Sequence, residues 1–411
     1  MIHFDSIKEG EPKLDIFEKC LKFTRAKEAM EHGIYPYFKP IQENHGPRVI
    51  MDGREIIMIG SNNYLGLTKD PRVQEAAIKA IEKYGTSCSG SRFLNGTLEL
   101  HEQLEARLAS FVKKEAALCF STGYQSNLGA ISTLVTKEDT IITDKTNHAS
   151  IFDGIFLAAG FNMGVNIKRY KHNDMNDLER VLSKLDPEKP RMIITDGVFS
   201  MEGDLVKLPK LAELSQKYKA RLYVDDAHGL GVEGKTGRGT MEHFNIWNEV
   251  DLVMCTFSKS FASLGGFIAG KTEVIHYIKH FSRPLIFSAS MPPANIAAVL
   301  KSLEIIEIEP QIVHRLQNIG KKMIREFQAL GFYTGESETP IVPIIIGEDE
   351  KTFQFWAALF QEGIYANPVI SPAVPPDRSL IRTSYMATHQ DNDLAIVLEK
   401  FKKIGKSMGL I

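Results

Sequence analysis

The stretch Asp251-Leu-Val-Met-Cys-Thr-Phe-Ser-Lys-Ser260, followed by Leu264-Gly-Gly266, decides the fold of this chain. Its apolar run at 252–255 predicts a buried strand. The strand gives way to small hydroxyl residues around Lys259 and then to paired glycines, which allow close approach of backbone or ligand. Strands of an open α/β sheet end in this way where a ligand lies at their carboxyl edge. The same residues also fit a surface lysine after a strand, so the neighbouring motifs must decide.

A second stretch, Leu222-Tyr-Val-Asp-Asp-Ala-His228, has the same organisation. Its apolar run predicts a strand that ends at Asp225. Further strands that end in polar loops are expected at 117–120, 140–143 and 191–195. Strands that alternate with helical segments predict βαβ units and a mostly parallel sheet. The carboxyl edge of this sheet would carry polar side chains along its length.

The chain has 411 residues, enough for a large core and a second, smaller domain. We expect a large α/β domain over 61–291, with a mostly parallel sheet flanked by helices. A helix over 12–33 and short strands at 49–59 precede it within 1–60, and a smaller α+β domain follows over 292–411. The other expected elements are helices at 71–84, 98–112, 294–331 (broken near Pro310) and 391–407, and strands at 341–346 and 379–384.

Composition excludes several classes of protein. Lysine plus arginine (49) nearly balances aspartate plus glutamate (51), so nothing indicates a nucleic-acid partner. The cysteines are scattered without metal-ligand spacing, so we expect a reduced compartment and no metal site. Cys119 and Cys255 lie in apolar runs, where we expect buried small hydrophobes. Since the sequence has no secretory signal pattern and no 18-residue apolar run, we expect a cytoplasmic protein.

The loop Ser121-Thr-Gly-Tyr-Gln125 follows an expected strand and opens a helix. Free backbone N–H groups and the helix dipole suit it to one phosphate group, although it lacks the Walker pattern of nucleotide triphosphatases. Thr256 and Ser258 add hydroxyl groups beside Lys259.

Asp225 could hold a heteroaromatic nitrogen protonated, and His148 could stack on an aromatic ring. An amine, a phosphate-binding loop and a buried carboxylate together fit pyridoxal 5'-phosphate (PLP), which bonds to a lysine and pairs its ring nitrogen with an acidic residue. Each residue alone has an ordinary alternative. His148 and His228 could be core or loop histidines, Asp225 could cap a helix, and Arg382 could belong to an edge strand.

Five motifs of this chain resemble those of the α-oxoamine synthases, PLP enzymes of the aspartate-aminotransferase fold (fold type I). These enzymes condense an amino acid with an acyl thioester and release carbon dioxide. The resemblance extends over about residues 35–400. The motifs are Thr256-Phe-Ser-Lys-Ser260, Val224-Asp-Asp-Ala-His228, Asn147-His-Ala-Ser150, Ser121-Thr-Gly-Tyr-Gln-Ser-Asn127 and Asp196-Gly-Val-Phe-Ser-Met-Glu-Gly-Asp204.

The resemblance implies three catalytic residues. Lys259 forms a Schiff base with PLP and later moves the Cα proton, Asp225 pairs with the pyridine nitrogen, and His148 stacks on the ring. His228 would bond to the pyridoxal hydroxyl. The matched phosphate-side residues are Gly123, Tyr124, Thr256 and Ser258. For the substrate, the resemblance implies that Arg382 binds the carboxylate with the help of Asn63.

Within the family, the segments 37–42, 90–97 and 367–375 look most like those of bacterial members that join L-serine to a long-chain acyl thioester such as palmitoyl-CoA. Their products are 3-ketodihydrosphingosine, carbon dioxide and CoA, in the first step of sphingolipid synthesis. Some of these enzymes carry a further arginine at the position of Ile370, which is a departure here. The alternatives are 2-amino-3-ketobutyrate CoA ligase, 8-amino-7-oxononanoate synthase and a PLP aminotransferase.

The resemblance also implies a homodimer with shared active sites. The hydroxyl- and glycine-rich loop 85–97 is the candidate for the segment that reaches the neighbouring subunit. The helix expected at 12–33 could pack on that subunit or rest on a membrane face, which would make the protein peripheral at the inner side of the membrane.

Overall fold

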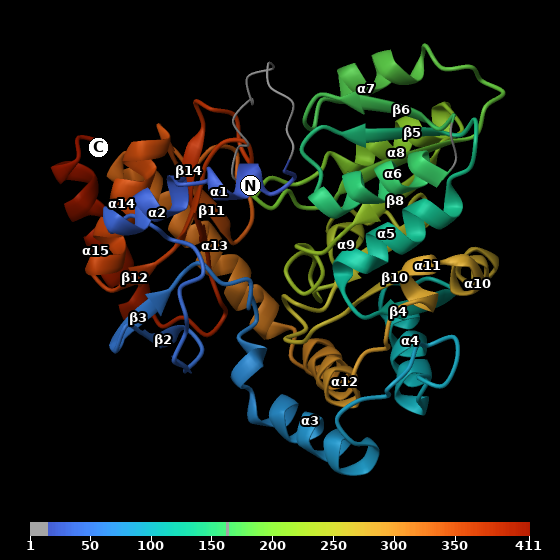
Figure 1. Ribbon diagram of the computed structural model, residues 1–411, viewed down its shortest axis with the longest axis horizontal. Coiled ribbons are helices and arrows are strands. Elements are labelled where there is room, and N and C mark those ends of the chain that lie inside the picture. The colour runs from blue at the N-terminus through green and yellow to red at the C-terminus, as the bar shows by residue number, and fades with distance from the viewer. Residues whose placement is uncertain (1–14, 162–163) are drawn as a thin grey trace.

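A computed structural model of the chain describes residues 15–161 and 164–411 (Figure 1). Its largest sheet has seven strands, of which only β10 runs against the others. The carboxyl ends of the remaining six therefore meet at one edge. The strands in spatial order are β4 (Ala116–Phe120), β10 (Gly266–Gly270), β9 (Leu252–Thr256), β8 (Arg221–Asp225), β7 (Arg191–Asp196), β5 (Thr140–Asp144) and β6 (Asn166–Tyr170).

Helices cover both faces of this sheet because successive residues of each strand point to opposite sides. In β9, Leu252 and Met254 belong to one core, and Val253 and Cys255 belong to the core on the other side. Cys119 and Cys255 are buried among apolar residues, as predicted. The first core includes residues of α5 (Gly123–Leu134), α6 (Ala149–Phe161) and α10 (Thr272–Phe281), and the second includes residues of α4 (Glu99–Phe111), α7 (Met175–Leu182), α8 (Leu208–Lys217) and α12 (Pro293–Ile308).

The helix expected at 71–84 forms as α3 (Pro71–Tyr84). Asp70 caps it by accepting a hydrogen bond from the Arg72 N–H, and Gly85 ends it with a φ of 80°. The expected break near Pro310 separates α12 from α13 (Gln311–Leu330). Three short helices, η1 (Leu67–Lys69), α9 (Thr240–His243) and α11 (Arg283–Ile286), complete this part of the chain.

A smaller three-stranded antiparallel sheet forms the C-terminal part of the molecule. Its strands in order are β11 (Ile341–Gly347), β14 (Ser379–Ser384) and β13 (Asn367–Val369), with α14 (Asp349–Gln361) and α15 (Asp391–Ser407). The N-terminal strands pack into the same core, so the two ends of the chain share it (Figure 1). These strands, β1 (Glu43–Asn44), β2 (Arg48–Met51) and β3 (Arg54–Met58), form a sheet with β12 (Ile364–Tyr365).

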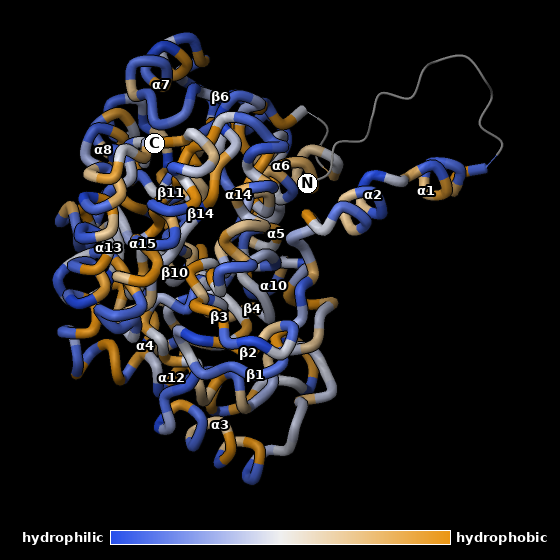
Figure 2. Tube along the Cα trace, turned by 90° about the vertical axis from the view of Figure 1, so that its left-hand side faces the viewer, coloured by the Kyte–Doolittle hydropathy of each residue, from blue (hydrophilic) through white to orange (hydrophobic). Residues whose placement is uncertain are grey.

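The single helix expected over 12–33 is not observed, and residues 12–14 lie outside the described part. Two short helices form instead, α1 (Glu18–Leu21) and α2 (Arg25–Glu31), separated at residues 22–24. Neither helix buries a residue, and both stand away from the body of the molecule (Figure 2). Without tertiary packing a longer helix gains little stability, which accounts for the break. Within residues 15–161 and 164–411, no helix combines the length and apolar character needed to cross a membrane.

Candidate active site

A cavity of about 240 Å³ opens at the carboxyl edge of the large sheet. Loops that follow β4, β5, β7, β8 and β9 line it, so the prediction that polar strand ends converge is confirmed. A groove of about 960 Å³ lies elsewhere, against α13, and none of the predicted site residues lines it. We therefore place the site in the smaller cavity. Eight predicted residues line it: Gly123, Tyr124, His148, Asp225, His228, Thr256, Ser258 and Lys259.

Lys259 lies three residues after the end of β9, on the loop that turns toward β10. Loss of hydration lowers the pKa of its amine to about 8, although the charge of Asp225 opposes this shift. A larger fraction of the amine is therefore uncharged near neutral pH than in an exposed lysine. An uncharged amine is the form that attacks a carbonyl carbon.

Asp225 is the last residue of β8 and is buried. Its Oδ2 accepts a hydrogen bond from Asn127 Nδ2 at 2.7 Å, and its Oδ1 accepts one from the Ala227 N–H at 3.1 Å. Asn127 is oriented in turn by the hydroxyl of Tyr223, which donates to Asn127 Oδ1 at 2.6 Å. The next carboxylate, Asp226, points elsewhere and accepts two hydrogen bonds from Thr240. Of the two adjacent carboxylates, Asp225 is therefore the one that lines the cavity.

His148 is held at the cavity by polar contacts with residues of α5, α6 and β7. Its Nδ1 lies 2.7 Å from Ser150 Oγ, which also accepts from Asn127 Nδ2 at 2.8 Å. Its backbone N–H donates to Asp196 Oδ2 at 3.1 Å. The other oxygen of Asp196 is buried without a hydrogen-bond partner among the described residues. Since Asp196 also lines the cavity, this oxygen is available to a polar group bound there.

The turn from β4 into α5 places the N-terminus of a 12-residue helix at the cavity. Thr122 caps the helix by accepting from the Gln125 N–H. A Cβ atom on Gly123 would lie 2.5 Å from Thr256 Cβ, so only glycine allows this close approach. Thr256 Oγ1 and Ser258 Oγ lie 2.9 Å apart beside it. Helix N–H groups and two hydroxyls are the chemistry that binds a phosphate. The cavity therefore fits PLP.

Arg382 and Asn63 do not line this cavity. Arg382 is buried in β14, and its Nε donates to the Ser200 carbonyl at 2.5 Å. Its Nη2 donates to Asn62 Oδ1 at 3.0 Å. The structure therefore brings Asn62 to Arg382, whereas the Asn63 amide donates to Thr68 Oγ1 at 2.8 Å. Among the described residues, no hydrogen bond joins Asn63 to Arg382. The role of Asn63 in substrate binding therefore stays a prediction.

Tyr64 connects Arg382 to the cavity. Its hydroxyl lies 2.7 Å from His228 Nδ1 and accepts from Arg382 Nη2 at 3.4 Å. Sequence reasoning assigned no role to Asn62, Tyr64, Asn127, Ser150 or Asp196. Three of these, Asn127, Ser150 and Asp196, lie inside motifs quoted above. Their position in those motifs could have indicated that they belong to the site.

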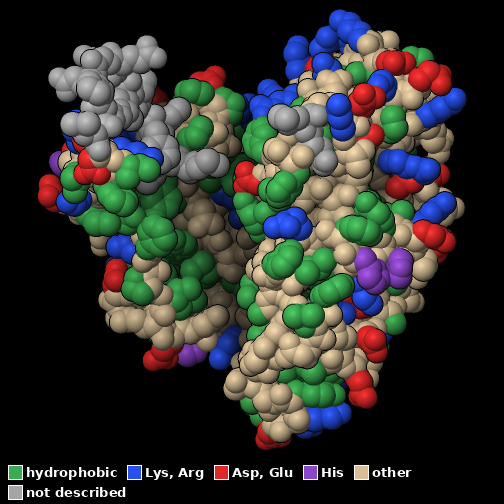
Figure 3. Space-filling view, turned by 45° about the vertical axis from the view of Figure 1, so that its right-hand side comes forward, with side chains coloured by type: hydrophobic (Ala, Val, Ile, Leu, Met, Phe, Trp, Pro, Cys, Tyr) green, Lys and Arg blue, Asp and Glu red, His purple; other side chains and the backbone are tan. Residues whose placement is uncertain are grey.

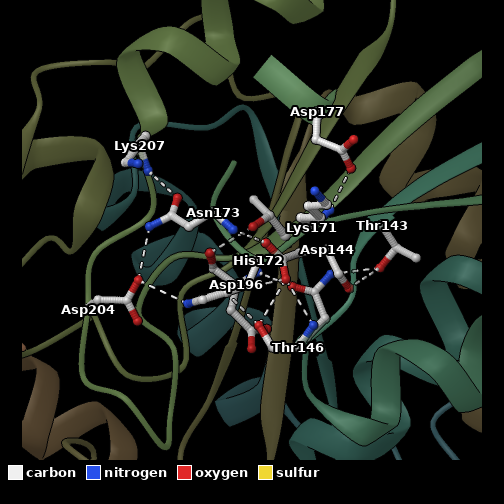
Figure 4. Close-up of polar contacts among 12 residues, drawn as sticks. Thr143, Asp144, Thr146, Lys171, His172, Asn173, Asp177, Asp196, Asp204 and Lys207 are labelled. Atoms are coloured by element: carbon white, nitrogen blue, oxygen red, sulfur yellow. Dashed lines mark hydrogen bonds and ion pairs between the residues drawn. The ribbon is translucent and has the colours of Figure 1, made fainter. Parts of the chain in front are cut away.

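A second polar cluster holds the loops that carry His148 and Ser200. His172 lies between two carboxylates, with Nδ1 3.4 Å from Asp144 Oδ1 and Nε2 3.3 Å from Asp204 Oδ2 (Figure 4). Asn173 bonds to the same carboxylates, by its N–H to Asp144 and by its side chain to Asp204. Asp144 begins the loop that leads to His148, and Asp204 lies on the loop after β7. The cluster therefore ties two walls of the site together.

The comparisons with known proteins agree with this geometry. The sequence model of the family described as aminotransferase class I and II matches residues 54–401. Serine palmitoyltransferase of Bacteroides thetaiotaomicron is 48% identical over 394 residues, which cover 96% of this chain and 99% of that protein. The enzyme of Sphingobacterium spiritivorum is 49% identical over 392 residues, covering 95% and 96%. An 8-amino-7-oxononanoate synthase of Thermoanaerobacter pseudethanolicus is 43% identical over 394 residues, covering 95% and 98%.

Among solved structures, SPT with a PLP internal aldimine matches with a TM-score of 0.92 and 32% identity, covering 98% of this chain and all (100%) of that one. Sphingomonas wittichii serine palmitoyltransferase matches with the same values. The chain therefore belongs to the aminotransferase class I and II family, the PLP-dependent transferases of fold type I. Within this family it is an acyltransferase whose predicted resemblance to α-oxoamine synthases, and to bacterial serine palmitoyltransferases among them, is confirmed. The predicted fold class and cofactor are confirmed as well.

We predict that His172 makes stability depend on pH. Burial disfavours its charge, but Asp144 and Asp204 outweigh burial and raise its pKa from 6.5 to about 10. This contribution is fully present below about pH 6.5 and is lost as pH rises through about 10. His172→Gln should therefore cost on the order of 2 kcal/mol at pH 6 and less at pH 10, measured by urea unfolding.

The matched control is His45→Gln, which removes a histidine paired with Glu43 at the surface. Exposed ion pairs contribute little, so this variant should keep the wild-type dependence on pH. A constant difference between wild type and His172→Gln from pH 6 to pH 10 would contradict the assignment.

Proposed function

We propose that this chain condenses L-serine with palmitoyl-CoA to give 3-ketodihydrosphingosine, carbon dioxide and CoA. The observation that carries the proposal is the cavity in which Lys259 and Asp225 converge, in a chain 48% identical to a serine palmitoyltransferase over nearly its whole length. In the reaction a bond forms between serine Cα and the acyl carbon. The thioester C–S bond and the bond from Cα to the carboxylate break.

The residues of the cavity divide into those that hold PLP and those that move protons. Gly123, Tyr124, Thr256 and Ser258 would hold its phosphate, and His148 would lie against its ring. Asp225 would pair with the ring nitrogen. Hydrogen bonds from Asn127 and Ala227 orient the Asp225 carboxylate for this role. When bound, PLP supplies an aldehyde carbon that links to amines and a ring that accepts the electrons released at Cα.

Lys259 and Arg382 would act on the substrate. The pKa of Lys259 near 8 lets its amine take and return the Cα proton of serine at neutral pH. Arg382 would bind the serine carboxylate. Among the described residues, its Nη1 donates only to Ser384 Oγ, at 3.5 Å, which leaves donors for a carboxylate oxygen.

Substitution of Asp225 tests the proposed pairing with the ring nitrogen. A carboxylate stabilises the protonated ring, so Asp225→Asn should keep the fold and lose activity on the order of 10²-fold or more. Steady-state rates and a circular dichroism spectrum measure both effects. Asp226→Asn is the matched control, since Asp226 bonds to Thr240 outside the cavity and its loss should leave most activity. Near-normal turnover of Asp225→Asn would overturn the role.

Substrate choice is tested by release of carbon dioxide from carboxyl-labelled serine, glycine and alanine, each with short, medium and long acyl-CoA. Serine with palmitoyl-CoA should react fastest. A site that hydrogen-bonds the serine hydroxyl rejects analogues without it. Each buried CH₂ of the acyl chain adds about 0.8 kcal/mol. A faster reaction of alanine with a pimeloyl thioester would favour 8-amino-7-oxononanoate synthase, the activity named for a relative at 43% identity.

We also propose a homodimer with shared active sites. The loop 85–97 is anchored by an ion pair of the buried Arg92 with Glu105 at 2.6 Å, yet it leaves Phe93 and Leu94 exposed by 53% and 78%. Hydrophobic side chains also gather along the cleft between the two halves of the molecule (Figure 3). Exposed apolar side chains on an anchored loop are typical of an interface. Light scattering that gives the mass of one chain would overturn this proposal.

The N-terminal segment 15–33 is a further candidate for contact, either with the partner subunit or with a membrane. It exposes Phe17 and Leu21 by 67% and 79%. We propose peripheral membrane contact of a cytoplasmic protein at the inner face of the membrane. Co-sedimentation with anionic vesicles should then fall when Phe17 and Leu21 are changed to serine, and absence of any co-sedimentation would contradict it.

A further inference from the structure

Tyr64 is a buried phenol outside the cavity that contacts both proposed ligand-binding regions. It lies on the loop between β3 and η1 and is 0% exposed. Backbone hydrogen bonds fix its position, since its N–H donates to the Asn62 carbonyl and its carbonyl accepts from the Ala387 N–H. Its ring meets the His228 ring edge to face, with centroids 6.0 Å apart. The phenol therefore has little freedom to choose other partners.

The contacts of the Tyr64 hydroxyl determine where its proton goes. Arg382 carries donors only, so the phenol oxygen must accept in that contact. Two acceptors compete for the phenol proton: His228 Nδ1 at 2.7 Å and Asn62 Oδ1 at 3.3 Å. Asn62 Oδ1 already accepts from Arg382 at 3.0 Å. The shorter distance favours donation to His228.

The imidazole of His228 is neutral in this position. Burial first, and then the charges of Lys259 and Arg382, hold its pKa well below the usual value. A neutral imidazole carries one N–H, and an Nδ1 that accepts from a phenol leaves that proton on Nε2. Because Nδ1 is occupied by Tyr64, Nε2 is the ring nitrogen left for a group bound in the cavity.

We propose that Tyr64 is a positioning residue that fixes His228 as the Nε2–H tautomer, so that His228 presents a hydrogen-bond donor to the ring oxygen of the cofactor. This inference rests on the proposed role of His228 toward PLP. Tyr64 does not line the cavity and so acts through the histidine. The contact also joins β14 to the end of β8, because the same phenol accepts from Arg382.

The first test is the tautomer itself, measured in the protein without cofactor. Nitrogen-15 NMR of histidine-labelled apoprotein distinguishes the two neutral tautomers by their nitrogen shifts and couplings to ring protons. The His228→Gln spectrum identifies the signal. We expect the Nε2–H pattern in wild type and a mixture of tautomers in Tyr64→Phe. An Nδ1–H pattern in wild type overturns the inference, whatever the Tyr64→Phe spectrum shows.

The second test is a double-mutant cycle read out as the dissociation constant of PLP from the folded apoprotein. Loss of one hydrogen bond should make Tyr64→Phe bind PLP about three- to tenfold more weakly. In a His228→Gln background the same change should alter the constant by less than about twofold, because the two residues then act as one unit. In an Arg382→Gln background Tyr64→Phe should keep its full effect.

Tyr385→Phe is the matched control, since Tyr385 is also fully buried but belongs to the C-terminal core and does not line the cavity. It should leave PLP affinity unchanged. If His228→Gln itself binds PLP normally, the proposed role of His228 fails. If His228→Gln binds PLP weakly but Tyr64→Phe binds it normally, the inference about Tyr64 fails while the role of His228 stands. The same holds if the effect of Tyr64→Phe on PLP affinity vanishes only in the Arg382→Gln background.

Discussion

The parallel register of β7, β8 and β9 is the constraint on which the rest of the structure depends. Asp196 pairs with Asp225 across β7 and β8, and Asp225 pairs with Met254 across β8 and β9. These three strands are neighbours in the sheet, and their parallel hydrogen bonding fixes their carboxyl ends at one edge. A lysine placed three residues beyond β9 therefore lines the same cavity as the carboxylate at the end of β8.

A buried carboxylate and a buried guanidinium are costly unless polar partners surround them. The site meets this cost with partners from distant parts of the chain. Asp225 is held by Asn127, and Arg382 is held by Ser200 and Asn62. The contact of Arg382 with Ser200 connects the C-terminal sheet to the loop after β7, so it also sets the position of Arg382 relative to the cavity.

The sequence predicted those parts of the fold in which local pattern and tertiary role agree. β8 and β9 are apolar runs that end in polar residues, and α3 has both an aspartate cap and a terminal glycine. β10 was not predicted because glycines at both of its ends resembled a loop, and β12 and β13 are too short to show a period. The N-terminal helix was predicted as continuous because its apolar residues recur at helical spacing. The sequence does not show that, in the part of the chain that the structure describes, neither of the two short helices buries a residue.

The site shows the same division. Residues inside motifs could be assigned, but the contact of Tyr64 with His228 joins positions 164 residues apart and follows only from the fold. Asn62 and Asn63 are adjacent and identical in type, so only the backbone of their loop decides that Asn62 contacts Arg382. The domain boundaries expected at 60 and 292 stay predictions. In the structure the N-terminal strands share the C-terminal core, and α12 packs in the core of the large domain.

The central claim is that Lys259 is the amine around which this edge of the sheet is built. Borohydride reduction of the PLP-loaded protein, followed by protease digestion and mass spectrometry, measures where the cofactor is bonded. The account predicts a pyridoxyl group on the peptide that contains Lys259, and none in a Lys259→Ala variant that still folds. A label on another lysine, or an undiminished label in Lys259→Ala, would contradict it.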